Sequence, residues 1–180
     1  MSRILLIRHC QSSGQAPDAP LTPDGVRAAL GLADRLAMLG ADAAYSSPFT
    51  RARQTLSPFA DRNGLPLALD DRLAERRLSP SPHEDWLDLI RKSFDDLDHA
   101  VPGGESLREA QRRGLAALAD IAAGGHRLPA VATHGNLLSS ILRHADASFG
   151  FDSWKDLRNP DLFLVSMAEG RPHAFERLAG

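Results

Sequence analysis

Apolar residues occur along this chain in two alternating patterns, short continuous runs and longer stretches with helical spacing. Residues 4–7 are Ile-Leu-Leu-Ile and residues 130–132 are Ala-Val-Ala, and such runs are typical of strands buried on both faces of a parallel sheet. Residues 26–39 instead repeat apolar side chains every three or four positions, which predicts an amphipathic helix. Because the two patterns alternate throughout, we expect an α/β protein, a three-layer sandwich with a mostly parallel central sheet flanked by helices.

Helix start signals refine these boundaries. Thr22-Pro23 and Ser47-Pro48 each combine an N-cap residue with proline at the first helical position. Ser81 with Glu84, and Ser106 with Glu109, have the spacing of a capping box. The predicted helices cover residues 23–39, 48–63, 82–97, 107–123 and 135–144. The predicted strands cover residues 4–7, 41–46, 66–69, 129–133 and 162–167, and residues 171–177 are expected to pair with the last of these as a hairpin.

Composition narrows the class of protein. A chain of 180 residues with 43% hydrophobic and 24% charged residues fits one globular domain spanning residues 1–180. The net charge is −2 and no basic cluster is interleaved with aromatics, so neither nucleic acid nor membrane is an expected partner. Cys10 is the only cysteine, and no apolar run is long enough for a signal peptide or a membrane span. We therefore expect a cytoplasmic protein without disulfides.

Candidate chemistry gathers where the predicted strands end. Arg8-His9-Cys10 follows the first strand, and Thr133-His134-Gly135 ends the strand over residues 129–133. Arg51 lies in the first turn of the helix that follows another strand. Ligands of open α/β sheets bind outside the carboxyl ends of the strands. Two histidines and two arginines are therefore expected to converge on one anion.

These motifs, in this order, resemble the signature of the histidine phosphatase superfamily, also called the phosphoglycerate mutase-like family. That signature is Arg-His-Gly near the N-terminus, an arginine within Ser-x-x-x-Arg-x-x-Gln-Thr, a mid-chain glutamate and a later His-Gly. The matching segments here are Arg8-His9-Cys10, residues 47–55, Leu73-Ala74-Glu75 and Thr133-His134-Gly135. Connecting pieces at residues 21–25 and 102–106 are also similar, so the resemblance runs from about residue 3 to about residue 145.

The resemblance implies a phosphoric monoester hydrolase that acts on a small phosphorylated metabolite through a phosphohistidine. The sequence has no HExxH motif and no cysteine pair, so neither a metal nor another cofactor is expected. The resemblance makes His9 the nucleophile, Glu75 the general acid–base, and His134 a hydrogen-bond donor to the transferring oxygens. The implied phosphate-binding residues are Arg8, Arg51, Gln11, Ser12 and Gly135. Arginine suits this task because its planar guanidinium binds phosphate bidentately. Glu75 has one alternative, a solvated carboxylate paired with Arg72 or Arg76.

Three other functions remain open. A phosphoglycerate mutase would return the phosphoryl group to its substrate, but family mutases are typically longer, which favours hydrolysis here. A protein phosphohistidine phosphatase is a second alternative, although the short forms usually lack the Gly-Gly-Glu-Ser segment found at residues 103–106. A member that binds phospholigands without turnover is a third. Cys10, in place of the family's glycine, favours that reading, whereas Glu75 argues against it.

Cys10 raises questions of its own. A cysteine phosphatase needs arginine six positions after its cysteine, and residue 16 is alanine, so Cys10 is not an expected nucleophile. Beside His134 and two arginines, the thiol is expected to have a lowered pKa and to be a site of alkylation. Gln15, where the family usually has asparagine, and Asn136 have no assigned contact. Substrate specificity is expected from residues 11–17 and 76–104.

Overall fold

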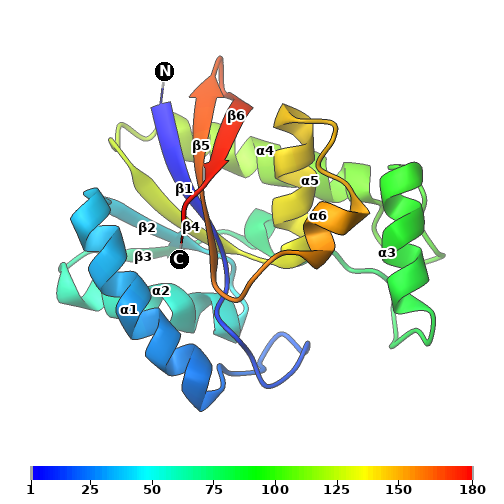
Figure 1. Ribbon diagram of the computed structural model, residues 1–180, viewed down its shortest axis with the longest axis horizontal. Helices are drawn as coiled ribbons and strands as arrows, with labels where there is room; N and C mark the ends of the chain where they lie inside the picture. The colour runs from blue at the N-terminus through cyan, green and yellow to red at the C-terminus, as the bar shows by residue number, and fades with distance from the viewer. Residues whose placement is uncertain (1, 180) are drawn as a thin grey trace.

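Over residues 2–179, which the computed structural model describes, six strands form a single sheet with helices on both faces (Figure 1). The strands are β1 (Ser2–Arg8), β2 (Ala43–Ser46), β3 (Leu67–Leu69), β4 (Pro129–Thr133), β5 (Asp161–Ala168) and β6 (Arg171–Arg177). Their order across the sheet is β3-β2-β4-β1-β5-β6. The first four are mutually parallel, and β5 is antiparallel to both β1 and β6. The mostly parallel sheet and the terminal hairpin predicted from the sequence are confirmed.

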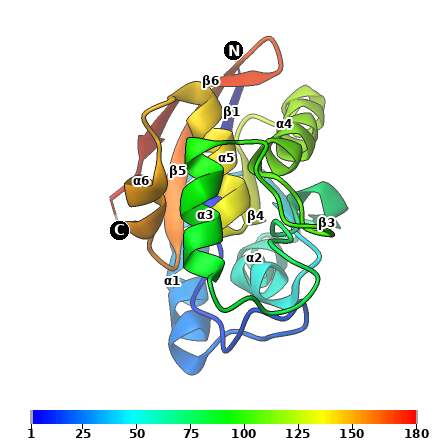
Figure 2. The same cartoon turned by 90° about the vertical axis from the view of Figure 1, so that its right-hand side faces the viewer.

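The helices form the two outer layers. They are α1 (Pro23–Leu39), α2 (Thr50–Arg62), α3 (Trp86–Asp95), α4 (Leu107–Ala123), α5 (Gly135–Ala145) and α6 (Phe151–Lys155), with a 3₁₀ turn at Asp71–Leu73. Helices α1 and α2 cover one face, and α4 and α5 cover the other (Figure 1). Helix α3 lies outside α5, beside α6 (Figure 2). None of these helices, within residues 2–179, is long and apolar enough to cross a bilayer.

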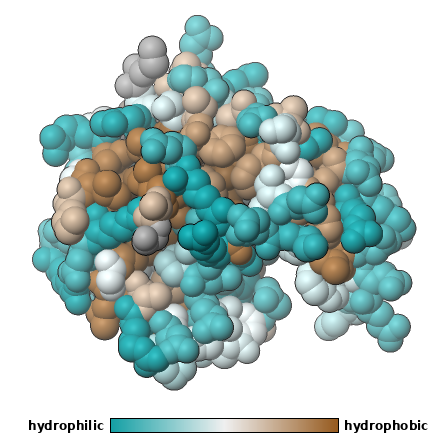
Figure 3. Space-filling model, viewed as in Figure 1, coloured by the Kyte–Doolittle hydropathy of each residue, from teal (hydrophilic) through white to brown (hydrophobic). Residues whose placement is uncertain are grey.

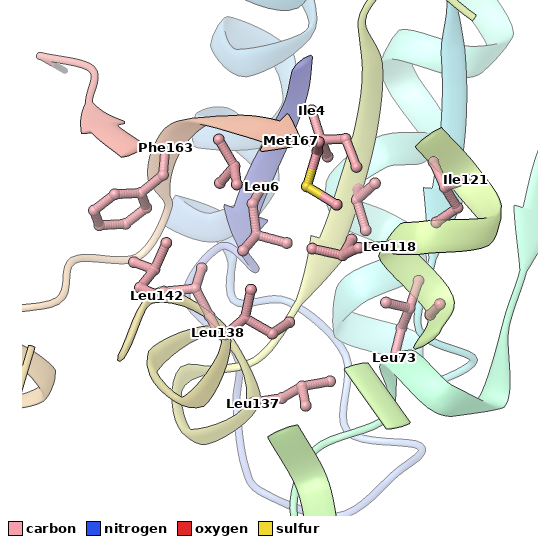
Figure 4. Close-up of a cluster of buried hydrophobic side chains, with 14 of the residues drawn as sticks. Ile4, Leu6, Leu73, Leu118, Ile121, Leu137, Leu138, Leu142, Phe163 and Met167 are labelled. Atoms are coloured by element: carbon pink, nitrogen blue, oxygen red, sulfur yellow. The ribbon is translucent and has the colours of Figure 1, made fainter. Parts of the chain in front are cut away.

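The apolar run of β1 is buried on both faces, as predicted. Ile4 and Leu6 join the cluster formed with α4 and α5, whereas Leu5 and Ile7 join the cluster formed with α1 and α2. This division follows from the alternation of side chains along a strand. Figure 4 shows the first cluster, which includes Leu118, Ile121, Leu137, Leu138, Leu142 and Met167. Residues 4–7 therefore hold β1 at the centre of the molecule, and its carboxyl end is firmly placed.

Two of the predicted helix starts are confirmed in detail. The Thr22 side chain accepts a hydrogen bond from the Gly25 backbone N–H, and Pro23 is the first residue of α1. Ser106 and Glu109 form the reciprocal capping box at the start of α4, at 3.1 Å and 2.8 Å. In both cases the local sequence satisfies backbone N–H groups that a helix leaves free at its first turn.

The other two predicted starts are wrong. Helix α2 begins at Thr50 rather than Pro48, and Ser47 does not cap it. Helix α3 begins at Trp86 and ends at Asp95, so the expected helix over residues 82–97 is shorter at both ends. Residues 81–85 are exposed, so little burial is available to stabilise a first turn there. A helix start supported by local signals alone is marginal in water.

Candidate active site

The site lies where the parallel strands end. His9 directly follows β1 and donates its backbone N–H to the Thr133 carbonyl of β4 at 3.0 Å, and His134 directly follows β4. The two imidazole rings meet edge to face, with centroids 5.1 Å apart. On this side of the sheet the surface is hollowed between α3 and the loop that precedes α1 (Figures 1 and 3). The structure therefore brings together two motifs that are 125 residues apart in the chain.

His9 is held in one orientation by both ring nitrogens. Its Nδ1 lies 2.6 Å from the Cys10 carbonyl oxygen, so Nδ1 carries the proton and donates it. Its Nε2 accepts a hydrogen bond from Arg51 Nε at 3.1 Å. Burial is the main cause that lowers the pKa of His9 to about 4; the Cys10 hydrogen bond opposes this and the charges of Arg51 and Arg8 add to it. His9 is therefore neutral at pH 7, with the lone pair on Nε2.

His134 is fully buried at the start of α5, and its Nε2 lies 2.7 Å from the Ser47 hydroxyl. Burial first, and then the nearby His9 and arginines, hold its pKa well below the ordinary value. Ser47 accepts from the Phe49 backbone N–H and has its own proton to donate to Nε2. With that bond formed, the proton of the neutral ring is on Nδ1. Ser47 therefore acts on His134, and not on α2 as its position before a proline had indicated.

The two arginines reach the site from different elements. Arg51, 1% exposed, donates through Nη1 to the carbonyls of Gln15 and Ala16 at 3.1 and 2.9 Å, which fastens the loop before α1. Arg8 donates through Nη1 to the Leu157 carbonyl at 2.8 Å. Burial lowers the pKa of both guanidinium groups, and the charge of Glu75 opposes this shift. Both stay cationic at pH 7, because an arginine pKa starts several units higher.

Glu75 follows the 3₁₀ turn and faces the N-terminus of α5. Its oxygens accept from the backbone N–H groups of Asn136 at 3.1 Å and Leu137 at 3.2 Å, and from its neighbour Arg76 at 2.8 Å. Free N–H groups at a helix N-terminus bind the side-chain oxygens of an acidic residue. The alternative pairing with Arg72 or Arg76 is wrong. The Arg72 side chain binds Asp70 and Asp120. The Arg76 side chain binds the Glu105 carbonyl and Ser93.

Three buried polar atoms around the histidines have no hydrogen-bond partner among residues 2–179. They are Arg8 Nε, His134 Nδ1 and Asn136 Oδ1. Buried polar groups are normally paired, because an unpaired one costs about 1–3 kcal/mol. Two of the three atoms are donors, and both belong to the constellation predicted from the sequence. These two donors and the Arg51 guanidinium suit a ligand that supplies several acceptor oxygens.

The remaining predicted site residues differ in their placement. Gly135 lies against Arg8, and a Cβ atom there would be 3.3 Å from Arg8 Nε, so glycine keeps room for the guanidinium. Gln11 is exposed, and its Oε1 accepts from Thr22 Oγ1 at 3.0 Å. Ser12 donates to the Gly14 carbonyl at 3.0 Å. The Gln11 and Ser12 side chains therefore brace the loop before α1, and neither is hydrogen-bonded to His9 or His134.

The expectation for Cys10 is wrong. Its thiol is completely buried in the apolar cluster beneath α1 and α2, and this burial raises its pKa to about 11. Consecutive side chains of an extended chain point in opposite directions, so His9 faces the site while Cys10 faces the core. Its backbone N–H donates to Thr55 Oγ1 at 2.9 Å. The thiol is therefore neutral, shielded from reagents, and outside the anion site.

This placement predicts an unreactive thiol. Under native conditions at pH 7.5, the protein should give almost no signal with Ellman's reagent, and iodoacetamide should leave activity unchanged, because the reactive thiolate is scarce and inaccessible. After unfolding in guanidinium chloride, about one thiol per chain should titrate, because Cys10 is the only cysteine. Rapid labelling of the native protein would show that residue 10 faces the solvent or the site.

Sequence reasoning missed two residues that contact the candidate nucleophile or its partner. Asn159 donates through Nδ2 to the His9 carbonyl at 2.7 Å, from 150 residues further along the chain. Ser47 carries a helix-cap signal, but its hydroxyl binds His134. Two signals place Ser47 at the strand ends: it is the first residue of the motif at residues 47–55, and it immediately follows β2. Asn159 lies in an irregular segment and carries no local signal.

Comparison with known proteins identifies the family. A family model described as "Histidine phosphatase superfamily (branch 1)" matches residues 4–176. "Putative phosphoserine phosphatase 2" of Hydrogenobacter thermophilus is 27% identical over 157 residues, covering 79% of this chain and 77% of its own length. "Probable phosphoglycerate mutase GpmB" of Yersinia pestis is 31% identical over 163 residues, covering 79% and 74%. The chain belongs to the histidine phosphatase superfamily, as its motifs had indicated.

Solved structures confirm the fold. A mycobacterial glucosyl-3-phosphoglycerate phosphatase in complex with VO3 superposes with a TM-score of 0.78 at 22% identity, over 98% of this chain and 97% of that one. Phosphoserine phosphatase from Entamoeba histolytica, in complex with 3-phosphoglyceric acid, gives a TM-score of 0.76 at 19% identity, over 100% and 98%. The α/β sandwich expected from the sequence is therefore the fold of known phosphatases.

Proposed function

We propose that this protein is a phosphatase that hydrolyses a small phosphorylated metabolite through a phosphohistidine at His9. The observation that carries the proposal is the state of His9, a buried neutral imidazole whose Nε2 lone pair lies against Arg51. A nucleophile at this position needs an unprotonated nitrogen and a neighbouring cation that binds the phosphoryl oxygens. The unpartnered Arg8 Nε and His134 Nδ1 supply two further donors beside it.

In the first step, the Nε2 lone pair of His9 attacks phosphorus as the bond from phosphorus to the ester oxygen breaks. The departing oxygen takes the proton of Glu75, so an alcohol leaves and Glu75 becomes a carboxylate. Charge on the transferring oxygens is stabilised by Arg8, Arg51 and His134. Gly135 supports this step by leaving room for the Arg8 guanidinium.

In the second step, water attacks the phosphohistidine. The Glu75 carboxylate takes a proton from the water as its oxygen bonds to phosphorus, and the N–P bond breaks to restore the lone pair of His9. Inorganic phosphate leaves, and Glu75 is again protonated for the next cycle. A neutral His9 suits this step too, because its Nδ1 proton stays hydrogen-bonded to the Cys10 carbonyl throughout. We assign Gln11 and Ser12 to bracing the neighbouring loop and not to phosphate, because their side chains bind Thr22 and Gly14.

The relatives support small phosphorylated metabolites as substrates, since their names specify phosphoserine, phosphoglycerate and glucosyl-3-phosphoglycerate. Mutase activity is a second candidate, favoured by the 31% identity to a protein named as a phosphoglycerate mutase. A mutase would transfer the phosphoryl group to a second hydroxyl and not to water.

We also propose that the protein works in the cytoplasm, because its single cysteine is buried and cannot form an internal disulfide.

A panel of phosphate monoesters tests the proposal directly. The purified protein should release inorganic phosphate from at least one of p-nitrophenyl phosphate, phosphoserine, 3-phosphoglycerate and sugar phosphates. Isomerised phosphoglycerate without phosphate release would establish the mutase alternative. Tight binding of phosphate or vanadate, with no turnover of any ester, would instead establish a member that binds phospholigands without catalysis.

A further inference from the structure

The segment that carries Glu75 has no regular structure of its own. It follows the 3₁₀ turn Asp71–Leu73, and residues 75–79 lie outside any helix or strand. Backbone of this kind is more mobile than the elements it connects. A carboxyl group that must meet one oxygen of a bound substrate therefore depends on side chains that fasten the segment.

Arg113 of α4 fastens this segment from one side. Its Nη1 donates to the carbonyls of Arg72 and Ala74, both at 2.7 Å. Its Nε and Nη2 bind the two carboxylate oxygens of Glu105 at 2.7 and 2.9 Å. Four of the five N–H groups of the guanidinium are thereby used within the protein. Arg113 is therefore committed to holding backbone, in contrast to Arg8, whose Nε is unpartnered.

Glu105 reaches Arg113 because two glycines precede it. A Cβ atom at Gly104 would lie 2.4 Å from the Leu78 carbonyl oxygen, and one at Gly103 would lie 2.8 Å from the Pro80 ring. Gly103 also has φ of +77°, a conformation that favours glycine. These glycines let residues 103–105 lie directly against residues 77–80, where the Glu105 N–H donates to the Arg77 carbonyl at 2.7 Å. The Pro-Gly-Gly-Glu-Ser segment thus builds one side of the Glu75 support.

Arg76 fastens the segment on the other side of Glu75. It is only 4% exposed, and its Nε donates to the Glu105 carbonyl at 2.7 Å while Nη1 donates to Ser93 Oγ of α3 at 2.7 Å. Glu105 is therefore shared, with its carboxylate on Arg113 and its carbonyl on Arg76. The backbone is held immediately before and immediately after Glu75.

We propose that Arg113 is a positioning residue for Glu75: paired with Glu105, it holds the Arg72 and Ala74 carbonyls and so fixes the carboxyl group that protonates the leaving oxygen. This inference rests on the proposed function, in which Glu75 is the general acid. Arg113 does not touch the substrate in this account. Arg113 instead sets the distance between the Glu75 proton and the ester oxygen, and the rate of proton transfer depends steeply on that distance.

Comparing two leaving groups distinguishes a positioning role from a general loss of stability, because a general loss would lower kcat/KM for both substrates equally. An alkyl phosphate needs a proton on its departing oxygen, whereas p-nitrophenolate leaves readily without one. Arg113→Met should therefore lower kcat/KM for the best alkyl phosphate of the panel by about 10-fold or more, within the range that general acids contribute. For p-nitrophenyl phosphate, the loss should stay below about 3-fold. Arg113→Lys, which keeps the charge and a shorter reach, should recover part of the loss.

Two further variants make the experiment decisive. Arg112→Met changes the adjacent, exposed residue of the same helix and should alter neither substrate's kcat/KM. Glu105→Gln removes the ionic partner of Arg113 and should reproduce the selective loss at smaller size. It also serves if Arg113→Met does not fold, which thermal unfolding of each variant will show. An equal loss for both substrates in folded variants, or no loss, would overturn the role of Arg113.

Glu75→Gln separates this inference from the proposed function. If it causes a large loss that is selective for the alkyl phosphate, the general acid is established, and the Arg113 result then decides the positioning role. If Glu75→Gln affects both substrates equally, the acid assignment itself fails, and the positioning role fails with it. A selective loss in Glu75→Gln without any in Arg113→Met or Glu105→Gln would overturn the positioning role alone.

Discussion

Replacing His9 with alanine is expected to abolish turnover, with kcat falling by at least about 10³-fold, because it removes the unprotonated Nε2 that lies against Arg51. The variant should also lose the covalent intermediate. In the wild type, quenching during turnover of a ³²P-labelled substrate should trap a phosphoenzyme that is labile in acid and stable in base, as expected for a phosphohistidine. Phosphate release and trapped label are the two measurements.

The control for this experiment is His144→Ala, which removes an exposed histidine near the end of α5 and should retain wild-type activity. The His9 variant should remain folded, since a small side chain at the strand end leaves β1 and its pairing intact. If folded His9→Ala kept more than a few per cent of wild-type activity, the nucleophile would have to be another group. A phosphoenzyme stable in acid would point to a different residue as well.

Arg51→Ala is expected to show the second largest effect, a loss of about 10²-fold or more in kcat/KM. Arg51 orients His9 Nε2, supplies a buried positive charge and fastens the Gln15 and Ala16 carbonyls, so its removal affects both the nucleophile and the anion. Inhibition by vanadate and by phosphate should weaken in parallel. Steady-state kinetics with a single ester, with and without each anion, measure all of these effects.

Two variants accompany this one. Arg53→Ala removes an exposed arginine two positions further along α2, and its kinetics should match those of the wild type. Arg51→Lys keeps a charge but lacks the planar fork, so its activity should fall between the wild type and Arg51→Ala. Unchanged vanadate inhibition in folded Arg51→Ala would show that this arginine does not bind the anion.

Much of the architecture was predictable because it is encoded locally. Alternating strand and helix patterns predicted the three layers, and the run at residues 4–7 predicted a strand buried on both faces. The ends of β1 and β4 located His9 and His134 at one edge of the sheet, because parallel strands end on the same side. The capping signals at Thr22 and Ser106 predicted helix starts correctly, because an amphipathic helix follows each of them immediately and packs on the sheet.

Only the tertiary structure determined the contacts between segments that are distant in the sequence. Ser47 carries a helix-cap signal, yet its hydroxyl binds His134, 87 residues away. The sequence leaves Glu75 either as a solvated carboxylate or as a catalytic acid. Its place at the start of α5 depends on backbone N–H groups 61 and 62 residues further along the chain.

Cys10 illustrates the same limit within a single motif. Its sequence neighbours predict a position beside two arginines and a histidine. However, the Cys10 side chain points away from the His9 side chain, so the thiol lies in the core. The motif therefore determined which residues come to the strand ends. The packing of α1, α2 and α5 determined which way each side chain points, because burial and hydrogen bonding between elements outweigh local preference.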